Sequence, residues 1–241
     1  MRQKENMPMS NIRELSSKLV SIQEVKRAYS LLTVPGQVVE IRALNASREQ
    51  NSRYTQTLGG YFDNVNDLIK ETLTIRQATG IYITLQPCHP DLLHRAKNKL
   101  VPQKKDFSTS DKYIIGYQWL PIDSDPERVS EISSTEEEHQ KSVAHSKKIR
   151  EALRAEGWPE PIMADSGNGS HLLYHIDLPT SEAPLIKRIL EGLATRFDED
   201  GIHVDKTLYN PSRIIKLYGT LACKGDNTHE RPHRFSRILE Y

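Results

Sequence analysis

Apolar residues recur at regular intervals through the first third of the chain. Their spacing of three and four residues predicts two amphipathic helices, over residues 11–32 and 64–79. Each of these segments is followed by a run rich in β-branched residues, and these runs predict strands over 38–42 and 81–85. The first part of the sequence is therefore expected to form a small α/β module.

Polar segments separate these elements. The stretch 47–60 is polar and ends in glycine, which predicts a loop. A short basic helix is expected over 90–100, and the polar loop over 102–112 is expected to mark a boundary between subdomains. The predicted parts are a tail and helix (1–35), an N-terminal α/β module (36–116) and a C-terminal module (117–241).

The second half follows a clearer order of elements. A strand over 119–122 precedes a helix whose start fits a capping box, either Ser134 with Glu137 or Thr135 with Glu138. The later predicted elements are strands over 162–164 and 171–176 around a turn at 166–169, a helix over 186–197, and strands at 204–205 and 213–217. This β-α-β-β-α-β order is that of ferredoxin-like folds, so we expect an α+β protein with an RNA-recognition-like sheet.

The composition says more about the class of protein and its cellular environment than about its activity. The 241 residues have a formal net charge of +1, with 37% hydrophobic and 27% charged residues, as in ordinary globular proteins. A nucleic-acid site must then be a local basic cluster. Cys88 and Cys223 are the two cysteines, which disfavours a secreted disulfide scaffold. With no signal peptide and no apolar run near the roughly 20 residues of a membrane span, we expect a cytoplasmic protein without membrane contact.

Two aspartates follow the apolar run 119–122. Asp123 and Asp125 are separated by one residue, so on a strand they point to the same face. Such a pair suits Mg²⁺, which prefers oxygen ligands. An isolated Asp-x-Asp sequence more often caps a turn, here the turn into Pro126. The apolar run favours the metal site, because it places the pair at the mouth of a buried strand.

A glycine-containing turn, Ser166-Gly167-Asn168-Gly169, precedes the strand that begins near His171. The Asn-Gly pair predicts a β-hairpin. Two glycines also let backbone N–H groups turn toward an anion, and hydroxyl, amide and imidazole groups suit a triphosphate. The two interpretations are compatible, because the turn of a hairpin can also bind phosphate.

Several residues near the C-terminus become candidate site residues only when they are considered together with these motifs. Asp205 follows Val204 and could complete a two-metal carboxylate site, although such a residue is usually a surface carboxylate. The cations Arg213, Lys216 and Lys224 are candidates to bind a triphosphate or strand phosphates, although a charge run is usually a solvated face. Arg213 and Lys216 point to opposite faces of a strand, so they are not expected to reach the same ligand.

These constellations, in this order, resemble the archaeo-eukaryotic primase superfamily, and in particular the primase-polymerases of bacteria, plasmids and phages, including the CRISPR-associated ones. The resemblance extends over most of residues 36–241. The residues that match the family's three motifs are, in order, Asp123 with Asp125, Ser166 with His171, and Val204 with Asp205.

The resemblance implies an N-terminal α/β module packed on an RNA-recognition-like catalytic sheet, together forming one catalytic domain. It implies a DNA primase or polymerase, a nucleotidyltransferase that uses two Mg²⁺ or Mn²⁺ ions held by Asp123, Asp125 and Asp205. The implied partners are a single-stranded DNA template, a primer strand, NTPs or dNTPs, and helicase or CRISPR adaptation proteins. The chain ends at Tyr241, soon after the last motif, so autonomous primer initiation is left open.

This interpretation assigns further residues to two ligands. The residues assigned to the incoming nucleotide are Ser166, Gly167, Asn168, Gly169, His171, Arg213, Lys216 and Lys224. The residues assigned to nucleic acid, from their basic surroundings, are Arg42, Arg48, Arg53, Arg231 and His233. Two other functions fit the same sequence. A non-catalytic replication initiator or strand-binding module is disfavoured by the intact aspartates, and a metal-dependent nuclease is disfavoured by the triphosphate-like turn.

Overall fold

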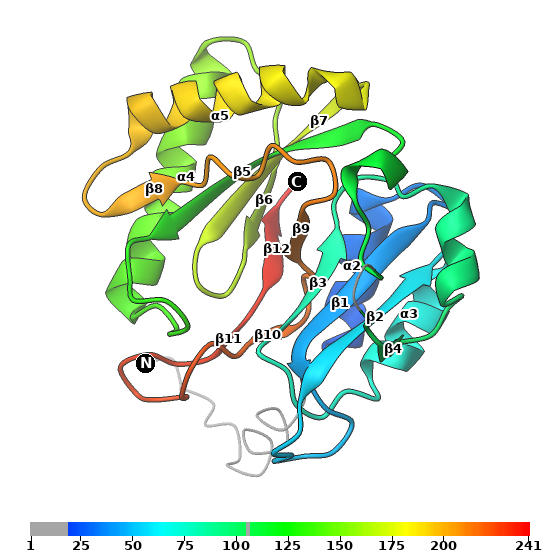
Figure 1. Ribbon diagram of the computed structural model, residues 1–241. Coiled ribbons are helices and arrows are strands. Elements are labelled where there is room, and N and C mark those ends of the chain that lie inside the picture. The colour runs from blue at the N-terminus through cyan, green and yellow to red at the C-terminus, as the bar shows by residue number, and fades with distance from the viewer. Residues whose placement is uncertain (1–18, 105–106) are drawn as a thin grey trace, which may run out of the picture.

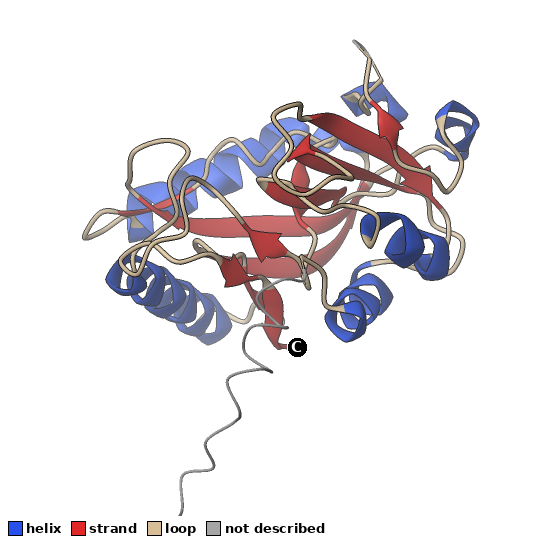
Figure 2. Ribbon diagram, turned by 90° about the horizontal axis from the view of Figure 1, so that it is seen from below, coloured by secondary structure: helices blue, strands red, loops and turns tan. Residues whose placement is uncertain are grey.

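The computed structural model describes residues 19–104 and 107–241, and these form two five-stranded antiparallel sheets (Figure 1). The first sheet contains, in spatial order, β4 (Val101–Pro102), β2 (Gln56–Phe62), β1 (Val39–Ala46), β3 (Gly80–Thr84) and β9 (Ile214–Lys216). The helices α2 (Ile22–Leu32) and α3 (Val65–Thr72) share one apolar core with this sheet. Seen from below, strands occupy the centre of the molecule and helices its outside (Figure 2).

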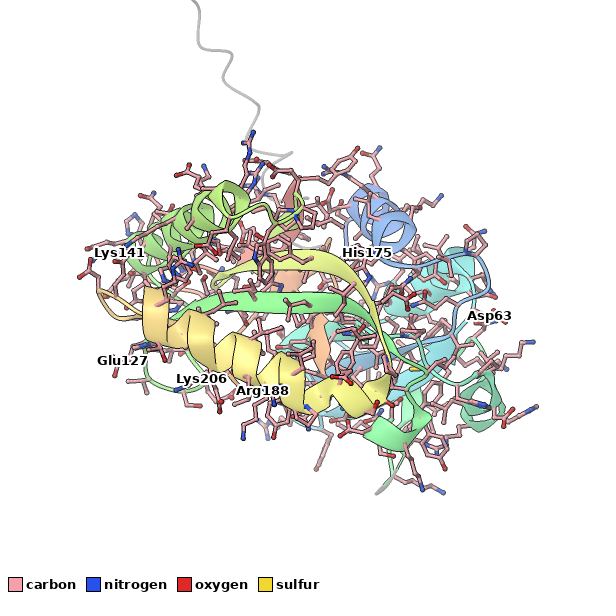
Figure 3. All side chains as sticks on the ribbon, turned by 90° about the horizontal axis from the view of Figure 1, so that it is seen from above. Asp63, Glu127, Lys141, His175, Arg188 and Lys206 are labelled. Atoms are coloured by element: carbon pink, nitrogen blue, oxygen red, sulfur yellow. The ribbon has the colours of Figure 1, made fainter. Side chains whose placement is uncertain are left out.

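The second sheet contains, in spatial order, β12 (Arg237–Glu240), β6 (Ile162–Asp165), β7 (Ser170–Leu178), β5 (Tyr117–Pro126) and β8 (Ile202–Val204). The helices α4 (Glu136–Ala155) and α5 (Ala183–Phe197) connect these strands in the order β-α-β-β-α-β. The predicted α+β class and the ferredoxin-like order are therefore confirmed, with β12 added at one edge. Figure 3, seen from above, shows α5 lying across this sheet, with the labelled Arg188 on its outer side.

Short elements complete the chain. Three 3₁₀ helices are η1 (Pro90–Arg95), η2 (Asp111–Tyr113) and η3 (Thr180–Glu182). A two-stranded ribbon pairs β10 (Leu221–Ala222) with β11 (Arg234–Phe235). Within the described residues, no helix combines the length and the apolar character needed to cross a membrane.

The alternation of side chains along β5 divides it between two cores. Leu120 and Ile122 belong to the core that α4 and α5 share with the second sheet. Trp119, one residue away, belongs instead to the core formed with α2 and the first sheet. Because neighbouring strand residues point to opposite faces, Asp123 and Asp125 lie on the face opposite α4 and α5.

The start of α4 settles the choice between the two predicted capping boxes. Thr135 Oγ1 accepts a hydrogen bond from the Glu138 N–H, and the Glu138 carboxylate accepts one from the Thr135 N–H. Each partner thus satisfies an N–H group that the first helical turn leaves without an intrahelical acceptor. The Thr135 box is therefore correct.

Several local predictions were wrong. The stretch 47–60 is not loop throughout, because residues 56–60 belong to β2. Glycines there indicate close packing, since a Cβ on Gly60 would lie 1.8 Å from the Lys99 carbonyl oxygen. The helix predicted over 64–79 ends at Thr72, and the one over 90–100 is the 3₁₀ helix η1. Of the helix predicted over 11–32, residues 11–18 lie outside the described chain.

The last segment of the chain belongs to both sheets. The strand predicted over 213–217 is β9, and it pairs with β3 in the first sheet. Further on, β12 pairs with β6 in the second sheet. The division of the chain at residue 116 stays a prediction, and residues 214–240 join the two sheets across it.

Candidate active site

A cleft of about 110 Å³ lies where the two sheets meet. An adjoining hollow of about 350 Å³ shares Asp125, Arg128 and Lys224 with it. The predicted site residues that line the cleft are Asp123, Asp125, Ser166, Asn168, His171, Lys216 and Lys224. The fold therefore brings together residues from β5, the β6–β7 turn, β7, β9 and the segment after β10.

The acidic pair lies on one face of β5, as its spacing predicted. Asp123 Oδ1 is buried and has no hydrogen-bond partner among the described residues. Burial and the charge of Asp123 raise the pKa of Asp125. Arg128 offsets part of this rise, because its guanidinium lies 2.9 Å from Asp125 Oδ1. Two neighbouring carboxylates, one of them with a buried oxygen that accepts no hydrogen bond from the described residues, form a site that suits a cation.

His171 lies beside this pair. It is the cross-strand neighbour of Asp123 in the β5–β7 register, and its Nε2 lies 3.5 Å from Asp123 Oδ2. Its Nδ1 is 2.6 Å from the hydroxyl of Tyr218. Burial alone would lower the pKa of His171, but the charge of Asp123, followed by that of Asp125, outweighs burial and raises it. The imidazole is thus fixed on both sides and electrostatically tied to the acidic pair.

The β6–β7 turn lies directly over β5. Gly167 has a φ of +92°, and a Cβ on Gly169 would lie 2.5 Å from the Ser124 carbonyl oxygen, so both positions require glycine. The N–H groups of Ser166, Gly167 and Gly169 are all hydrogen-bonded within the turn or to Asp165. The predicted hairpin is present, but those three N–H groups are not free to bind an anion. The turn instead presents the side chains of Ser166 and Asn168 to the cleft.

The turn is held from behind by buried polar groups. Asp165 Oδ1 accepts hydrogen bonds from the Gly167 N–H at 2.7 Å and lies 2.9 Å from His139 Nε2. Asn168 Oδ1 accepts a hydrogen bond from the Ser134 N–H at 3.0 Å. These contacts tie the turn to the start of α4, so its conformation is set by the fold and does not depend on a ligand.

The three predicted cations occupy different positions. Lys216 is fully buried in the cleft, where burial lowers the pKa of its ammonium group to about 7. Its Nζ donates to the Leu221 carbonyl oxygen at 2.9 Å. Lys224 is half-buried and borders both hollows. Arg213 points elsewhere, because its guanidinium donates to the Thr207 carbonyl oxygen outside the cleft.

Asp205 lies next to the acidic pair but faces the adjoining hollow. Its N–H donates to the Asp123 carbonyl oxygen at 2.9 Å, so the two residues are neighbours through the backbone. Its Oδ1 accepts a hydrogen bond from the Thr207 N–H, and its side chain lines only the second hollow. In the described part of the chain, no group of three or more acidic, histidine or cysteine side chains is arranged to hold a metal ion. The carboxylates of Asp123 and Asp125 are placed to bind a cation in the cleft, whereas the carboxylate of Asp205 lines the adjoining hollow.

The residues predicted to bind nucleic acid differ in their availability. Arg42 forms two hydrogen bonds with the buried Glu40, which occupies its guanidinium. Arg48 donates to the Leu100 carbonyl oxygen and to the Glu71 carboxylate, yet its side chain stays half-exposed, and Arg53 is exposed. In the β10–β11 loop, Arg231 pairs with Glu138, and the His233 ring contacts the Gly225 carbonyl oxygen. Arg48 and Arg53 are thus the members of this set with most access to a ligand.

The sequence interpretation missed three residues of this site and one exposed tyrosine outside it. Arg128 contacts Asp125 directly, and Tyr218 contacts His171 directly. Tyr82 lines the cleft from β3, with Lys216 Nζ 5.4 Å from the centre of its ring. Outside the cleft, Tyr54 is 91% exposed in the β1–β2 connection beside Arg53. Only Arg128 had a local signal, since it lies three residues after Asp125; the others depend on pairings between distant strands or on exposure.

The sequence matches no family model and no curated protein. Among solved structures, the chain is similar to the AEP domain of the cyanophage S-2L primase-polymerase, with 16% identity over 92% of this chain and 91% of that one and a TM-score of 0.51. The polymerase domain of ligase D from Mycobacterium tuberculosis, in complex with DNA, has 12% identity over 88% of this chain and 79% of that one, with a TM-score of 0.47. The first likeness shows that the chain has the fold of a primase-polymerase AEP domain, and it confirms the resemblance to the archaeo-eukaryotic primases at the level of the fold.

Proposed function

We propose that this protein is a metal-dependent nucleotidyltransferase that extends or initiates primers on single-stranded DNA. The observation that supports this most is the acidic pair on β5. Asp123 has a buried oxygen that forms no hydrogen bond with any residue the structure describes, and it lies beside His171 in a cleft that also contains a buried lysine. A cleft lined by two carboxylates and by four basic side chains (Arg128, His171, Lys216 and Lys224) suits a cation bound together with an anionic ligand, which is what a metal–triphosphate complex is.

The acidic pair would hold the divalent cation, Mg²⁺ or Mn²⁺. When bound there, such cations lower the pKa of an attacking hydroxyl and neutralise the charge of a leaving pyrophosphate. Asp205 is the proposed third ligand, and for this its carboxylate must release the Thr207 N–H that it now accepts. Arg128 holds Asp125 from the side of the adjoining hollow, so it restricts the orientations that this carboxylate can adopt.

The basic residues of the cleft would bind the triphosphate. His171 lies beside Asp123 in the cleft, and its imidazole can donate a hydrogen bond to a phosphate oxygen. Lys216 is buried with a lowered pKa, and an approaching polyphosphate would restore its charge. Lys224 borders both hollows, so its ammonium group can bind a phosphate that lies in either of them. The side chains of Ser166 and Asn168 provide neutral hydrogen-bonding groups.

The template strand would contact the exposed basic residues of the first sheet. Arg48 and Arg53 lie in the β1–β2 connection, and Ser47 at its start bridges to Gln77 in the segment that leads to the cleft. Phosphate contacts of this kind position a strand without selecting its sequence. Helicase or CRISPR adaptation proteins as partners, and the cytoplasm as the compartment, stay predictions from the sequence.

Primer extension with site variants tests the proposal. The protein is incubated with Mn²⁺ or Mg²⁺, circular single-stranded DNA with or without a primer, and labelled NTPs or dNTPs. We expect incorporation by the wild type and a loss of at least about a hundredfold in Asp123→Asn, because a carboxylate ligand is replaced by an amide. Asp177→Asn is the matched control, since Asp177 is an exposed carboxylate on β7.

Three outcomes would contradict the proposal. Undiminished incorporation by Asp123→Asn would remove the acidic pair from the chemistry. Degradation of DNA without added nucleotides would indicate a nuclease. Binding of single-stranded DNA with no incorporation under any condition would indicate a strand-binding module.

A further inference from the structure

A second polar cluster lies directly behind the acidic pair, on the side of β5 that faces α4. We call it the serine–histidine cluster, and its members are Ser124, Ser142, His145, Ser146 and Ser170. All five side chains are buried, with exposed fractions of at most 3%. Since β5 side chains alternate, Ser124 points away from the cleft while its two acidic neighbours point into it. The chemistry described above makes no use of this cluster.

Three residues of α4 converge on Ser124. The Ser142 hydroxyl donates to the Ser124 carbonyl oxygen, His145 Nδ1 lies 2.9 Å from Ser124 Oγ, and the Ser146 hydroxyl donates to the same Oγ at 3.0 Å. Positions 142, 145 and 146 share one face of a helix. Both the backbone and the side chain of the residue between the two aspartates are therefore bonded to one rigid element.

His145 joins this site to a second helix. Its Nε2 lies 2.7 Å from the carbonyl oxygen of Phe197, the last residue of α5. A carbonyl can only accept, so Nε2 carries a hydrogen, and the other ring nitrogen, Nδ1, is within hydrogen-bond distance of the Ser124 hydroxyl. The imidazole thus spans from α5 to the middle of the Asp-Ser-Asp sequence, and each of its nitrogens has one partner.

The polarity of this cluster is not required for packing. Across β5 and β7, Ser124 lies opposite Ser170, whereas the adjacent pair on the same face is Ile122 and Leu172. A buried hydroxyl without a hydrogen-bond partner lowers stability, so a polar cluster at this depth is tolerated only when its groups are matched. Hydrogen bonds fix distances and angles, which apolar contacts do not. The contacts with Ser124 lie at the strand end that carries the aspartates.

We propose that His145 is a positioning residue, which acts through Ser124 to hold Asp123 and Asp125 at the separation needed to bind the divalent cation. The proposal rests on the proposed function of the acidic pair as a metal site. Residues that orient metal ligands from behind typically contribute about 10- to 100-fold in metal affinity or activity.

The test compares three variants of His145 in the full chain. His145→Leu removes both contacts. His145→Asn can keep a polar atom near the position of Nδ1 and hence the contact with Ser124, whereas His145→Gln can keep one near the position of Nε2 and hence the contact with Phe197. Leu153→Ala is the control, because Leu153 is buried on the same helix outside the cluster. For each protein, Mn²⁺ affinity is measured by electron paramagnetic resonance, kcat and KM for the nucleotide by primer extension, and stability by thermal unfolding.

We expect His145→Leu to weaken Mn²⁺ binding and to lower kcat by about tenfold or more, with KM for the nucleotide changed by less than about twofold. His145→Asn should recover most of the loss, and His145→Gln should not. Leu153→Ala should lower stability without changing Mn²⁺ affinity. The contrast between Asn and Gln separates positioning from packing, because both variants disturb the core.

The proposal is overturned if Mn²⁺ affinity in His145→Leu equals that of the wild type, if Asn and Gln are equally impaired, or if Leu153→Ala loses Mn²⁺ affinity to the same extent. It is also overturned if the wild type does not bind Mn²⁺. If His145→Leu does not fold, the Asn and Gln variants decide. Weakened Mn²⁺ binding in a protein whose wild type incorporates no nucleotide would support the positioning role while contradicting the proposed function, so the two can fail separately.

Discussion

The two ends of α4 contact the second sheet in chemically different ways. Toward its C-terminal end, Ile149 and Leu153 pack in the apolar core shared with α5. Toward its N-terminal end, the buried face is polar and consists of His139, Ser142, His145 and Ser146. The polar end lies beneath the acidic pair and the β6–β7 turn, and the apolar end lies away from both.

The two ends of α4 therefore have different roles: one stabilises the fold, and the other positions the strand that carries the aspartates. Apolar burial has no preferred direction, so it holds the helix to the sheet without fixing their relative position within a few tenths of an ångström. Hydrogen bonds weaken steeply when distance or angle changes, so the polar end fixes the strand that carries the aspartates. The same helix therefore contributes free energy at one end and positional accuracy at the other.

The largest expected effect comes from truncation at the apolar end. Ile149→Ala should lower the free energy of unfolding by about 2–4 kcal/mol, because it leaves a cavity in the core. Ser142→Ala should cost less, about 1–2 kcal/mol, since it removes one hydroxyl and leaves the Ser124 carbonyl oxygen without that donor. In urea unfolding, Ile149→Ala should be the more impaired variant. In primer extension, kcat should be lowered in Ser142→Ala and not in Ile149→Ala. Equal ranking in both assays would remove the distinction between the ends.

A second prediction concerns Lys216, on the opposite wall of the cleft. Its pKa is lowered by burial to about 7, while in the unfolded chain it is near the usual value of a lysine. The unfolded state thus binds more protons between these two values, so wild-type stability should rise with pH across the window from about 7 to 10, by at most about 1.4 kcal/mol per pH unit. Lys216→Met should be more stable at neutral pH and lose this rise, while nucleotide KM increases. Parallel stability profiles for the two proteins from pH 6.5 to 9.5 would show that Lys216 is not the group responsible.

The smallest effect is expected at Tyr54, which lies in the β1–β2 connection and not on α4. Tyr54 is 91% exposed, and its backbone is held by two hydrogen bonds with Ser52 Oγ. An exposed ring beside Arg53 suits the stacking of an unpaired base, so Tyr54→Ala should weaken binding of single-stranded DNA by about fivefold or more. Stability and Mn²⁺ affinity should not change. Tyr241→Ala is the control, because Tyr241 is also exposed, and an equal loss in both variants would remove Tyr54 from the template contact.

Much of the second sheet could be predicted from the sequence, because its signals are local. The period of the apolar residues sets the β-α-β-β-α-β order, and strand alternation places Asp123 and Asp125 on one face. Asn168-Gly169 predicts the hairpin. These features need only residues near one another in the chain, so their interpretation did not depend on the tertiary arrangement.

The rest depends on contacts between distant residues. β2 contains Gly59 and Gly60, and such a glycine pair resembles a loop until the close packing of Gln103 against Gly59 and of Lys99 against Gly60 is known. Tyr218 reaches His171 only because β9 crosses to the first sheet. The serine–histidine cluster has no sequence signal, since serines within a helix read as solvent-facing. These three features depend on contacts between segments that are distant in the chain, and the periodicity of the sequence does not encode such contacts.

The crossing of residues 214–240 between the sheets has a consequence for folding during synthesis. β9 covers the edge of β3, and β12 covers the edge of β6. A nascent chain that lacks this segment has two sheets with open edges, and such edges pair readily with other strands. It also lacks Lys216 and Lys224, and with them one wall of the cleft. During synthesis, the cleft therefore cannot be complete until this segment has left the ribosome, and the edges of β3 and β6 stay open to misassembly until then.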